Sequence, residues 1–336
     1  MTNHHRIDVF FHNNCFDGVC SSAVFSRLYQ AVADPEAVFS YRGMSYGKNA
    51  PGPDVLTCER NAIVDFQFLP SDRLTWWIDH HRSAFRSPAE KEHYEAERVR
   101  HAGRWFYDPE YPSCTKLIAD VGAREFNCRF PELDELVTWA NIIDSAGYES
   151  AAAGINYEAP AQALALVVQS GKVSDHLPAI ITLLQTRPLA EVVAGDIVQP
   201  LFRALHADHL QALDIIGRKA RCEGGVAWWD VVEEGLFGYS KFIGYSLFPE
   251  AMYTADVSQN PNRKKITLGF NPWCGRERQH NLAEICERYG GGGHAVVGAF
   301  PVPDDPAEVR EILMTVVKEL QGPGNAGATI SEKTSN

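Results

Sequence analysis

The sequence predicts an α/β protein in which a parallel-sheet N-terminal domain is joined by a helical connector to a smaller, mixed α/β C-terminal domain. Three observations support this fold class. Short apolar runs alternate with helical patterns in the first 80 residues, residues 151–222 have an almost wholly helical pattern, and strand patterns return from residue 224. We place the domains at residues 1–195, 196–223 and 224–320, and we expect the tail, residues 321–336, to be disordered.

The length and composition are those of a two-domain globular protein. The chain has 336 residues, of which 45% are hydrophobic and 22% are charged. Its N-terminus has no apolar signal core, and no run approaches the ~18 apolar residues of a membrane span. The eight cysteines form no CxxC pair, which argues against a disulfide scaffold or a zinc ribbon. We therefore expect a cytoplasmic protein without a membrane partner.

Four apolar segments of the N-terminal domain have the length and pattern of strands, and they cover residues 6–11, 39–43, 61–68 and 74–78. Polar side chains that bind metal or move protons accompany three of them. His12 follows the first segment, the third is predicted to be a strand that ends in the carboxylate Asp65, and Asp79, His80 and His81 follow the fourth. Because open parallel sheets hold their sites at the carboxyl ends of strands, we expect these side chains to lie close together.

The first strand leads into a polar turn and then into a small-residue helix that runs to about residue 33. Cys15 and Asp17 lie in this turn, and Gly18 permits a tight turn or close helix packing. A strand, a polar turn and a helix N-terminus can together surround an anion.

The remaining elements are assigned from the same patterns. Helices are expected over residues 113–120, 131–143, 189–221, 281–288 and 306–320, with a charged helix or lid over residues 86–104. Strands of the C-terminal domain are expected over residues 225–232, 244–248, 253–257 and 265–270, and a glycine-rich loop over residues 290–294. Asp144 follows a helix, where the dipole disfavours a carboxylate. Its position therefore indicates a partner such as a metal.

The strand-end side chains and Asp144 together form a candidate metal centre. Its members are His12, Cys15, Asp17, Asp65, Asp79, His80, His81 and Asp144. This set is too large for one ion and suits two, and mixed carboxylate and imidazole ligands favour Mn²⁺, with Fe²⁺ or Zn²⁺ as alternatives, over Mg²⁺. Two ions about 3.5–4 Å apart activate water and bind a phosphoryl group. The sequence thus predicts hydrolysis of a phosphate ester or anhydride.

The ordered motifs resemble the DHH phosphoesterase family with its DHH-associated C-terminal domain. The resemblance covers about residues 6–320 and depends on Asp79-His80-His81 together with Gly290-Gly-Gly-Gly-His294. It implies a catalytic domain over residues 1–195 and a substrate-binding domain over residues 224–320. Within the family, pyrophosphatases generally lack the glycine-rich loop, so its presence favours a nucleotide-type substrate.

The resemblance also implies a role for each matching residue. It implies that His12 and the position of Cys15 bind a first metal, that Asp17, His80 and Asp144 bind a second, and that Asp65 bridges them. It implies that Asp79 orients a histidine and that His81 contacts the phosphate or protonates the leaving oxygen. It further implies that substrate contacts come from Gly291, Gly292, Gly293 and His294.

The first motif departs from the family pattern. The family commonly has His-x3-Asp-x-Asp, whereas this chain has His12-x2-Cys15-x-Asp17. Two interpretations stay open. Either the softer Cys15 thiolate binds the first metal and shifts its preference toward iron or zinc, or Cys15 stays outside the coordination sphere and Asn13 or Asn14 positions a water.

Basic and aromatic side chains of the C-terminal domain are weaker candidates. Substrate phosphates could meet Arg276 and Arg278, or the neighbouring Lys264 and Lys265, but a solvated charged face is the favoured explanation of these residues. Likewise, Tyr245, Phe270 and Trp273 could stack a base or pack in the core.

Three functions fit the sequence. The first is a metal-dependent phosphoesterase acting on a small nucleotide or a short oligonucleotide. The formal charge of −12 argues against long nucleic acid, which needs a basic stripe. The second is a nucleotide-binding regulatory protein with a degraded metal site, and the third is a phosphatase of polyphosphate or another non-nucleotide substrate. A homodimer is compatible with each of them.

Overall fold

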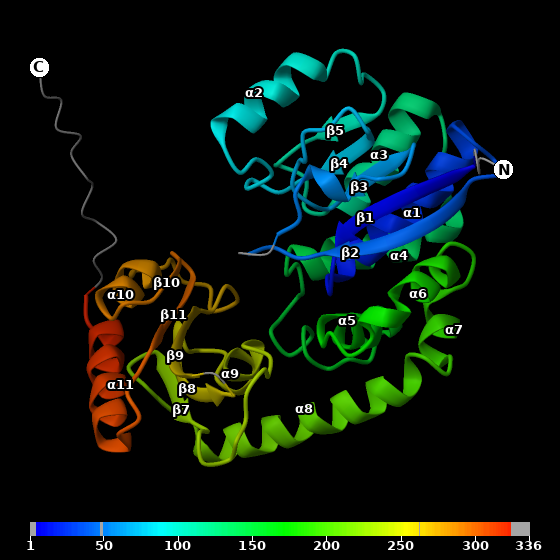
Figure 1. Ribbon diagram of the computed structural model, residues 1–336. Helices are drawn as coiled ribbons and strands as arrows, with labels where there is room; N and C mark the ends of the chain where they lie inside the picture. The colour runs from blue at the N-terminus through cyan, green and yellow to red at the C-terminus, as the bar shows by residue number, and fades with distance from the viewer. Residues whose placement is uncertain (1–4, 48–49, 262, 324–336) are drawn as a thin grey trace, which may run out of the picture. The chain divides into compact units, whose positions relative to one another are not determined.

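The structure is a computed structural model that describes residues 5–47, 50–261 and 263–323 (Figure 1). The chain divides into two compact units, residues 1–148 with 157–205 and residues 149–156 with 206–336. Among the described residues, no helix combines the length and apolar character needed to cross a bilayer. Of the predicted disordered tail, residues 324–336 lie outside the described part, while Gln321 ends a helix.

The first unit contains a five-stranded parallel sheet in the order β2-β1-β3-β4-β5. Its strands are β1 (Arg6–His12), β2 (Val38–Met44), β3 (Asn61–Val64), β4 (Leu74–Asp79) and β5 (Trp105–Tyr107). The predicted α/β class with a parallel sheet is confirmed. Strand β3 ends at Val64, directly before the carboxylate Asp65, as predicted, whereas the three-residue β5 was not predicted.

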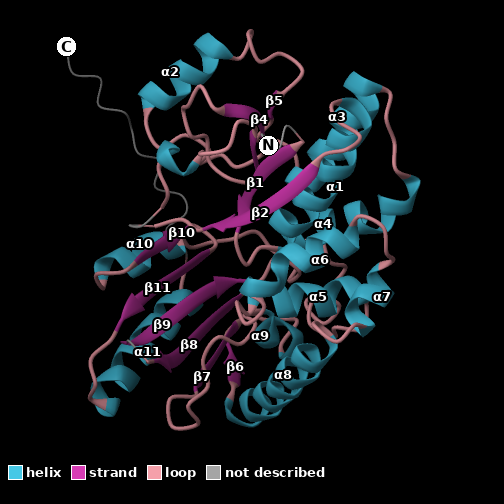
Figure 2. Ribbon diagram, turned by 45° about the vertical axis from the view of Figure 1, so that its right-hand side comes forward, coloured by secondary structure: helices cyan, strands magenta, loops and turns pink. Residues whose placement is uncertain are grey.

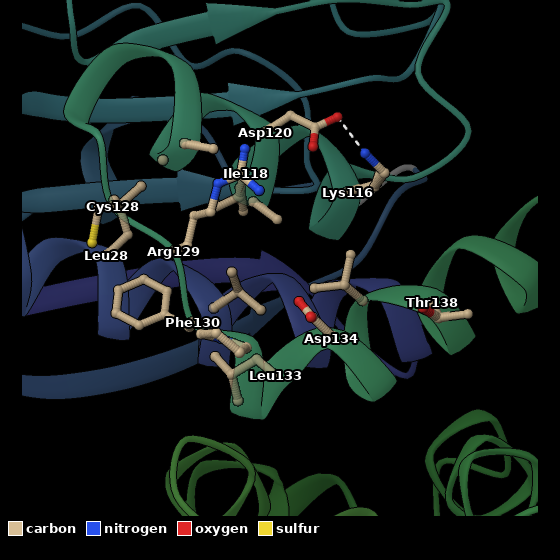
Figure 3. Close-up of a pocket in the computed structure, with 16 residues that line it drawn as sticks. Leu28, Lys116, Ile118, Asp120, Cys128, Arg129, Phe130, Leu133, Asp134 and Thr138 are labelled. Atoms are coloured by element: carbon tan, nitrogen blue, oxygen red, sulfur yellow. Dashed lines mark hydrogen bonds and ion pairs between the residues drawn. The ribbon is translucent and has the colours of Figure 1, made fainter.

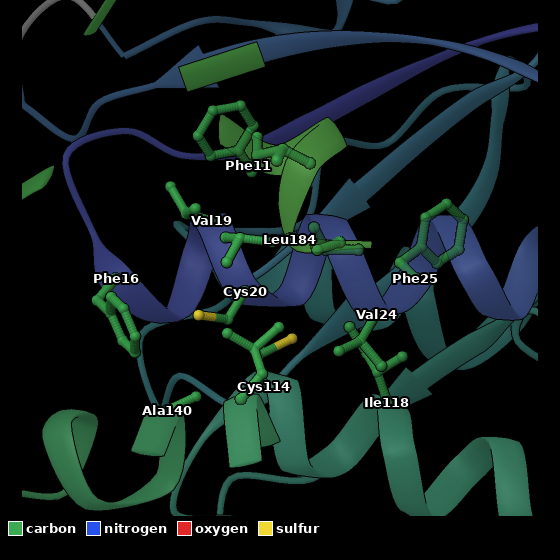
Figure 4. Close-up of a cluster of buried hydrophobic side chains, with 14 of the residues drawn as sticks. Phe11, Phe16, Val19, Cys20, Val24, Phe25, Cys114, Ile118, Ala140 and Leu184 are labelled. Carbon is green, nitrogen blue, oxygen red and sulfur yellow. The ribbon is translucent and has the colours of Figure 1, made fainter. Parts of the chain in front are cut away.

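Both faces of this sheet are buried. Along β1, Ile7 and Val9 belong to the larger hydrophobic cluster, whereas Phe10 belongs to a second cluster around Trp77 on the other face. Figure 4 shows part of the larger cluster, to which the helix Phe16–Val32 contributes Phe25 and the helix Cys114–Phe126 contributes Cys114 and Ile118. Burial of each large apolar side chain stabilises the folded state by about 1.5–3 kcal/mol. A sheet covered on both faces leaves its strand ends as the place for polar chemistry.

Eight helices accompany the sheet (Figure 2) in the described part of the chain. They are α1 (Phe16–Val32), α2 (Pro88–Glu97), α3 (Cys114–Phe126), α4 (Asp134–Asp144), α5 (Pro160–Gln169), α6 (Leu177–Leu184), α7 (Leu189–Ala194) and α8 (Gln199–Lys219). Short 3₁₀ turns are η1 (Pro53–Val55), η2 (Pro131–Leu133) and η3 (Ser174–His176). Helix α8 leads from the first unit into the second and lies within the predicted connector, residues 196–223.

The second unit contains a mixed six-stranded sheet in the order β10-β11-β9-β8-β7-β6. Its elements are β6 (Arg221–Glu223), β7 (Val226–Asp230), α9 (Phe242–Leu247), β8 (Tyr253–Asn260), β9 (Arg263–Phe270), α10 (Leu282–Arg288), β10 (Gly292–His294), β11 (Val297–Pro301) and α11 (Pro306–Gln321). Strands β7 and β8 are parallel, and the other pairs are antiparallel. The predicted smaller mixed domain is thereby confirmed as a fold class.

Two local predictions in this unit were wrong. Residues 244–248 were predicted as a strand but belong largely to helix α9, because a short apolar run fits either conformation. Gly244 of this helix packs directly against Trp229, and a Cβ atom at this position would lie only 2.5 Å from the Trp229 ring. The glycine-rich segment was predicted as a loop, but Gly292–His294 forms a short strand paired with β11.

Candidate metal centre

The carboxyl ends of three adjacent strands bring the predicted metal ligands together. Strands β1, β3 and β4 are neighbours, and their register aligns Phe11 with Val64 and Val64 with Ile78. His12 ends β1, Asp65 directly follows β3, and the Asp-His-His segment begins at the end of β4. Residues that are far apart in the sequence therefore lie close together at this edge of the sheet.

Asp65 lies at the centre of the cluster and is 1% exposed. Its backbone has φ +55°, a left-handed conformation that few residues other than glycine adopt, and its N–H donates to the Ile78 carbonyl at 3.0 Å. Neither carboxylate oxygen has a hydrogen-bond partner among the described residues. Burial and the charge of Asp17 raise the pKa of Asp65 well above its usual range. A nearby cation would pair with the unpaired oxygens and offset the repulsion between the Asp65 and Asp17 carboxylates.

Asp17 is held by the N-terminus of a second helix. Its Oδ2 accepts a hydrogen bond from the Cys114 N–H at 2.7 Å, and its Oδ1 accepts one from the Thr115 N–H at 3.0 Å. These donors open α3, where the helix dipole favours negative charge. The neighbouring Gly18 is required by packing, because a Cβ atom there would approach the His12 carbonyl oxygen to 2.4 Å. The hydrogen bonds of Asp17 thus hold the segment after β1 against the N-terminus of α3.

A backbone contact orients the imidazole of His80. Its Nδ1 lies 3.0 Å from the Tyr111 carbonyl oxygen, which can only accept, so Nδ1 carries the proton and Nε2 presents a lone pair. Nε2 lies 3.4 Å from Asp65 Oδ1, 3.4 Å from Asp144 Oδ2 and 3.7 Å from Asp17 Oδ2. It has no hydrogen-bond partner within the described ranges. One nitrogen lone pair therefore faces three carboxylates.

Asp144 ends α4 and completes this side of the cluster. Partial burial and the charge of Asp17 raise the pKa of Asp144 to about 7. The carboxylates repel one another in this arrangement, so the protein alone does not balance their charge. The placement agrees with the inference that a carboxylate at a helix C-terminus needs a partner.

His81 and Asp79 form a separate pair beside the cluster. His81 Nδ1 lies 2.7 Å from Asp79 Oδ1, and Asp79 is fully buried. Burial alone would lower the pKa of His81, but the hydrogen bond and charge of Asp79 raise it to about 9. His81 Nδ1 also lies 3.8 Å from Asp65 Oδ1. Asp79 therefore orients the His81 ring.

Three overlapping groups of side chains offer ligand atoms that lie within 4.8 Å of one another, and these groups are His12–Cys15–Asp65, Asp65–His80–His81 and Asp17–His80–Asp144. Asp65 is shared by the first two groups and contacts His80 of the third at 3.4 Å. The buried unpaired oxygens and the oriented imidazole fit divalent cations. The size of the set fits two of them.

Comparison with solved structures identifies the fold. No protein-family model matches the sequence, and no curated protein sequence matches it significantly. A pGpG-specific phosphodiesterase, PggH from Vibrio cholerae, is similar in structure with a TM-score of 0.68 and 17% sequence identity, over 95% of this chain and 100% of that one. RecJ from Thermus thermophilus, solved with Mn²⁺, has a TM-score of 0.54 and 16% identity, over 95% of this chain and 52% of that one. The chain has the DHH phosphoesterase fold.

The fold confirms the resemblance that the sequence motifs predicted. The identification of the second unit as a DHH-associated domain stays a prediction, as does the role of each ligand.

The unusual first motif of this DHH fold places Cys15 in the cluster. The Cys15 side chain is grouped with His12 and Asp65. Asn14 instead accepts a hydrogen bond from the Ser174 hydroxyl at 2.8 Å, and the Asn13 side chain packs against Gly43. Burial, followed by the charge of Asp65, raises the pKa of the Cys15 thiol. A thiolate here therefore needs a bound cation.

The glycine-rich segment belongs to the second unit and contains two kinds of position. A Cβ atom at Gly291 would approach the Ala299 oxygen to 2.2 Å, and one at Gly293 would approach the Val297 oxygen to 2.3 Å. At Gly292, a Cβ atom would meet no described atom within 4 Å. His294 is exposed at the end of β10. Packing against β11 thus explains two glycines but not Gly292.

The weaker basic and aromatic candidates have structural contacts of their own. Arg276 donates to the Glu250 carbonyl at 3.0 Å, and Arg278 donates to the His280 carbonyl at 2.6 Å. Tyr245 is 2% exposed. It packs in the core and is not a surface on which a base could stack.

A pocket of about 420 Å³ in the first unit contains none of the metal-centre residues (Figure 3). It lies between α1, α3 and α4, and its walls combine apolar side chains such as Leu28 and Leu133 with Arg129 and Asp134. The candidate chemistry therefore lies at the strand ends and not in this hollow.

Sequence reasoning missed the groups that hold the ligands in place. The Tyr111 carbonyl and the N–H groups of Cys114 and Thr115 are backbone atoms, which leave no side-chain signal. It also missed Tyr46, whose ring lies 5.0 Å from that of His12. The nearest available signal was Ser113, the N-cap of α3, whose side chain accepts from the Lys116 N–H.

Proposed function

We propose that this protein is a metal-dependent phosphoesterase that hydrolyses phosphodiester or phosphomonoester bonds of small nucleotides or short oligonucleotides. The observation that carries the proposal is the Asp65 carboxylate, which is buried and unpaired among the described residues and is shared between ligand groups. A carboxylate in this state is costly unless it binds cations. A shared carboxylate between two ligand groups is the arrangement that a two-metal hydrolase needs.

Each side chain has a proposed task. His12, Cys15 and Asp65 would hold one divalent ion, and Asp17, His80 and Asp144 would hold the other, with Asp65 common to both. Such ions, when bound, activate a water and neutralise charge on a phosphoryl group. We favour Mn²⁺ because the donors mix carboxylate and imidazole.

His81 would act on the substrate side of the centre. Because its Nδ1 contacts Asp79, its Nε2 is the nitrogen left to donate a proton to a phosphate oxygen or to the leaving oxygen. Asp79 is a positioning residue in this scheme, since it reaches the reaction through His81.

The substrate class rests on three supports. PggH, which this chain resembles over 95% of its own length and 100% of PggH, is named for activity on pGpG. The net charge of −12 disfavours a long nucleic acid. The open face of Gly292 allows a ligand to approach the backbone closely, with His294 nearby, so we propose this segment as a substrate contact. A cytoplasmic location and a homodimer stay predictions.

The proposal is tested by incubating metal-free protein, reloaded with Mn²⁺, with a panel of substrates followed by chromatography. The panel contains a linear dinucleotide, a five-residue oligonucleotide, a cyclic dinucleotide, 3′-phosphoadenosine phosphate and polyphosphate. Turnover limited to nucleotides is the expected result. Turnover of polyphosphate alone would identify a non-nucleotide phosphatase. Nucleotide binding without any turnover would instead indicate a regulatory protein with a degraded site.

A further inference from the structure

An exposed aromatic ring lies beside the metal centre and has no role in the scheme above. Tyr46 follows β2 by two residues and is 40% exposed. Its ring centroid lies 5.0 Å from that of His12 and 6.0 Å from that of His81. The ring therefore adjoins both the first ligand group and the histidine proposed to contact phosphate.

The Tyr46 ring is held in place and is not a freely moving surface side chain. It stacks on Phe66, with ring centroids 4.4 Å apart and an interplanar angle of 28°. Phe66 directly follows Asp65, so the same segment positions the shared carboxylate and the ring on which Tyr46 stacks. This coupling fixes the ring relative to the metal centre.

Packing alone does not account for the residue. Phe66 is fully buried, and an aliphatic side chain could cover it. Tyr46 instead leaves apolar ring surface exposed next to a cluster of charged groups, where solvent-exposed apolar area has no stabilising effect. An aromatic surface held rigidly beside a phosphate site suits a planar group attached to that phosphate, because stacking is tolerant of base identity.

We propose that Tyr46 forms a stacking platform for the nucleobase attached to the reacting phosphate, and that it makes the centre prefer nucleotides over ring-free phosphates. The inference rests on the proposed function and deepens it, because it assigns the substrate class to a specific side chain. The base it receives would lie on the side of the centre that holds His12 and His81. Stacking on one aromatic ring changes affinity by about 5- to 150-fold.

The test measures binding of AMP and of inorganic phosphate to Mn²⁺-loaded protein by equilibrium dialysis. Tyr46→Leu keeps the apolar contact with Phe66 but removes the planar ring, and Tyr46→Phe keeps the ring. We expect Tyr46→Leu to weaken AMP binding about tenfold or more while phosphate binding stays unchanged, and Tyr46→Phe to retain most of the AMP affinity. Phe237→Ala, which removes a 54% exposed aromatic ring from the second unit, serves as the matched control and should bind AMP like the wild type.

The outcomes separate this inference from the proposed function. Equal AMP affinity in wild type and Tyr46→Leu, equal weakening of AMP and phosphate, or no AMP binding by the wild type would overturn the platform. Base-dependent AMP binding without hydrolysis of any substrate would overturn the proposed function and leave the platform standing. Melting temperatures of the variants identify any loss that comes from unfolding.

Discussion

Cys15 is the residue at which this chain departs most clearly from the expected ligand pattern. Its side chain reaches the group formed with His12 and Asp65, and its pKa is raised by burial and by neighbouring carboxylates. Cys15→Asp should therefore retain or increase Mn²⁺-dependent turnover, because a carboxylate is the harder ligand that Mn²⁺ prefers. Turnover and bound manganese are measured together. A collapse of turnover at unchanged manganese content would show that the thiol has a different task.

Asp256 in the second unit provides a pH-dependent prediction that does not involve the metal centre. It is 7% exposed, and burial raises its pKa to about 6 even though the Tyr239 hydroxyl donates to it at 2.8 Å and Lys265 lies nearby. The value in an unfolded chain is about 3.9, so the folded state binds the proton more tightly. Stability from this group is present below about pH 4 and is lost as the pH rises through 6.

Replacement of Asp256 should therefore stabilise the second unit at high pH. Asp256→Asn keeps an oxygen for the Tyr239 hydroxyl and removes the buried charge. We expect the unfolding free energy of Asp256→Asn, measured by urea denaturation, to exceed that of wild type by up to about 3 kcal/mol at pH 8 and by about half as much at pH 5. A difference that does not depend on pH would show that the Asp256 carboxyl is not the titrating group.

Most metal-centre candidates could be predicted at this scale because each ligand type follows a recognisable strand or helix. What could not be predicted is how the ligands are held. The orientation of His80 depends on the Tyr111 carbonyl, and the left-handed backbone of Asp65 depends on the register of β3 with β4. Backbone contacts of this kind exist only once the sheet has formed.

At the scale of elements, the hairpin of β10 and β11 contains one glycine that packing requires and one that packing does not require. Gly291 is enclosed by Ala299 and Phe300, whereas Gly292 has open space above it among the described residues. Gly291→Ala should destabilise the second unit by about 1–3 kcal/mol through overpacking. Gly292→Ala should change stability by less than about 0.5 kcal/mol.

Of these two matched substitutions, Gly292→Ala, which affects stability less, should affect substrate binding more. Gly292→Ala should raise KM for a small nucleotide several-fold without altering the melting temperature, because the new methyl group occupies space that the substrate needs. KM and thermal melting of both variants are the measurements. An unchanged KM in Gly292→Ala would assign the whole glycine segment to folding.

Long elements with strong patterns were predicted well, and short ones were not. Strand β1 has the nearly continuous apolar run of a strand buried on both faces, and the buried residues of helix α11 follow a helical spacing. Strand β5 has three residues and helix α9 has six, too few for a pattern to distinguish helix from strand. Their conformations are set by tertiary neighbours, such as the pairing of Trp77 with Trp105.

For the whole molecule, the structure joins a doubly covered parallel sheet to a mixed sheet through one long helix, α8. The metal centre lies entirely in the first unit, and the glycine segment lies in the second. The sequence motifs indicated this division because the two signatures are about 200 residues apart. The proposed catalytic role of the first and the proposed substrate contact of the second can therefore be tested by separate substitutions.

The central claim is that the Asp65-centred cluster binds metal and hydrolyses phosphate esters. Its most direct test adds Mn²⁺ stepwise to metal-free wild type and to Asp65→Asn while bound manganese and cleavage of a linear dinucleotide are measured together. We expect cleavage to appear as two ions bind per chain, and to fall more than about 100-fold in Asp65→Asn, beyond the usual cost of losing a supporting contact. Wild-type protein that binds two ions and cleaves no phosphate ester, or Asp65→Asn that cleaves at the wild-type rate, would contradict the claim.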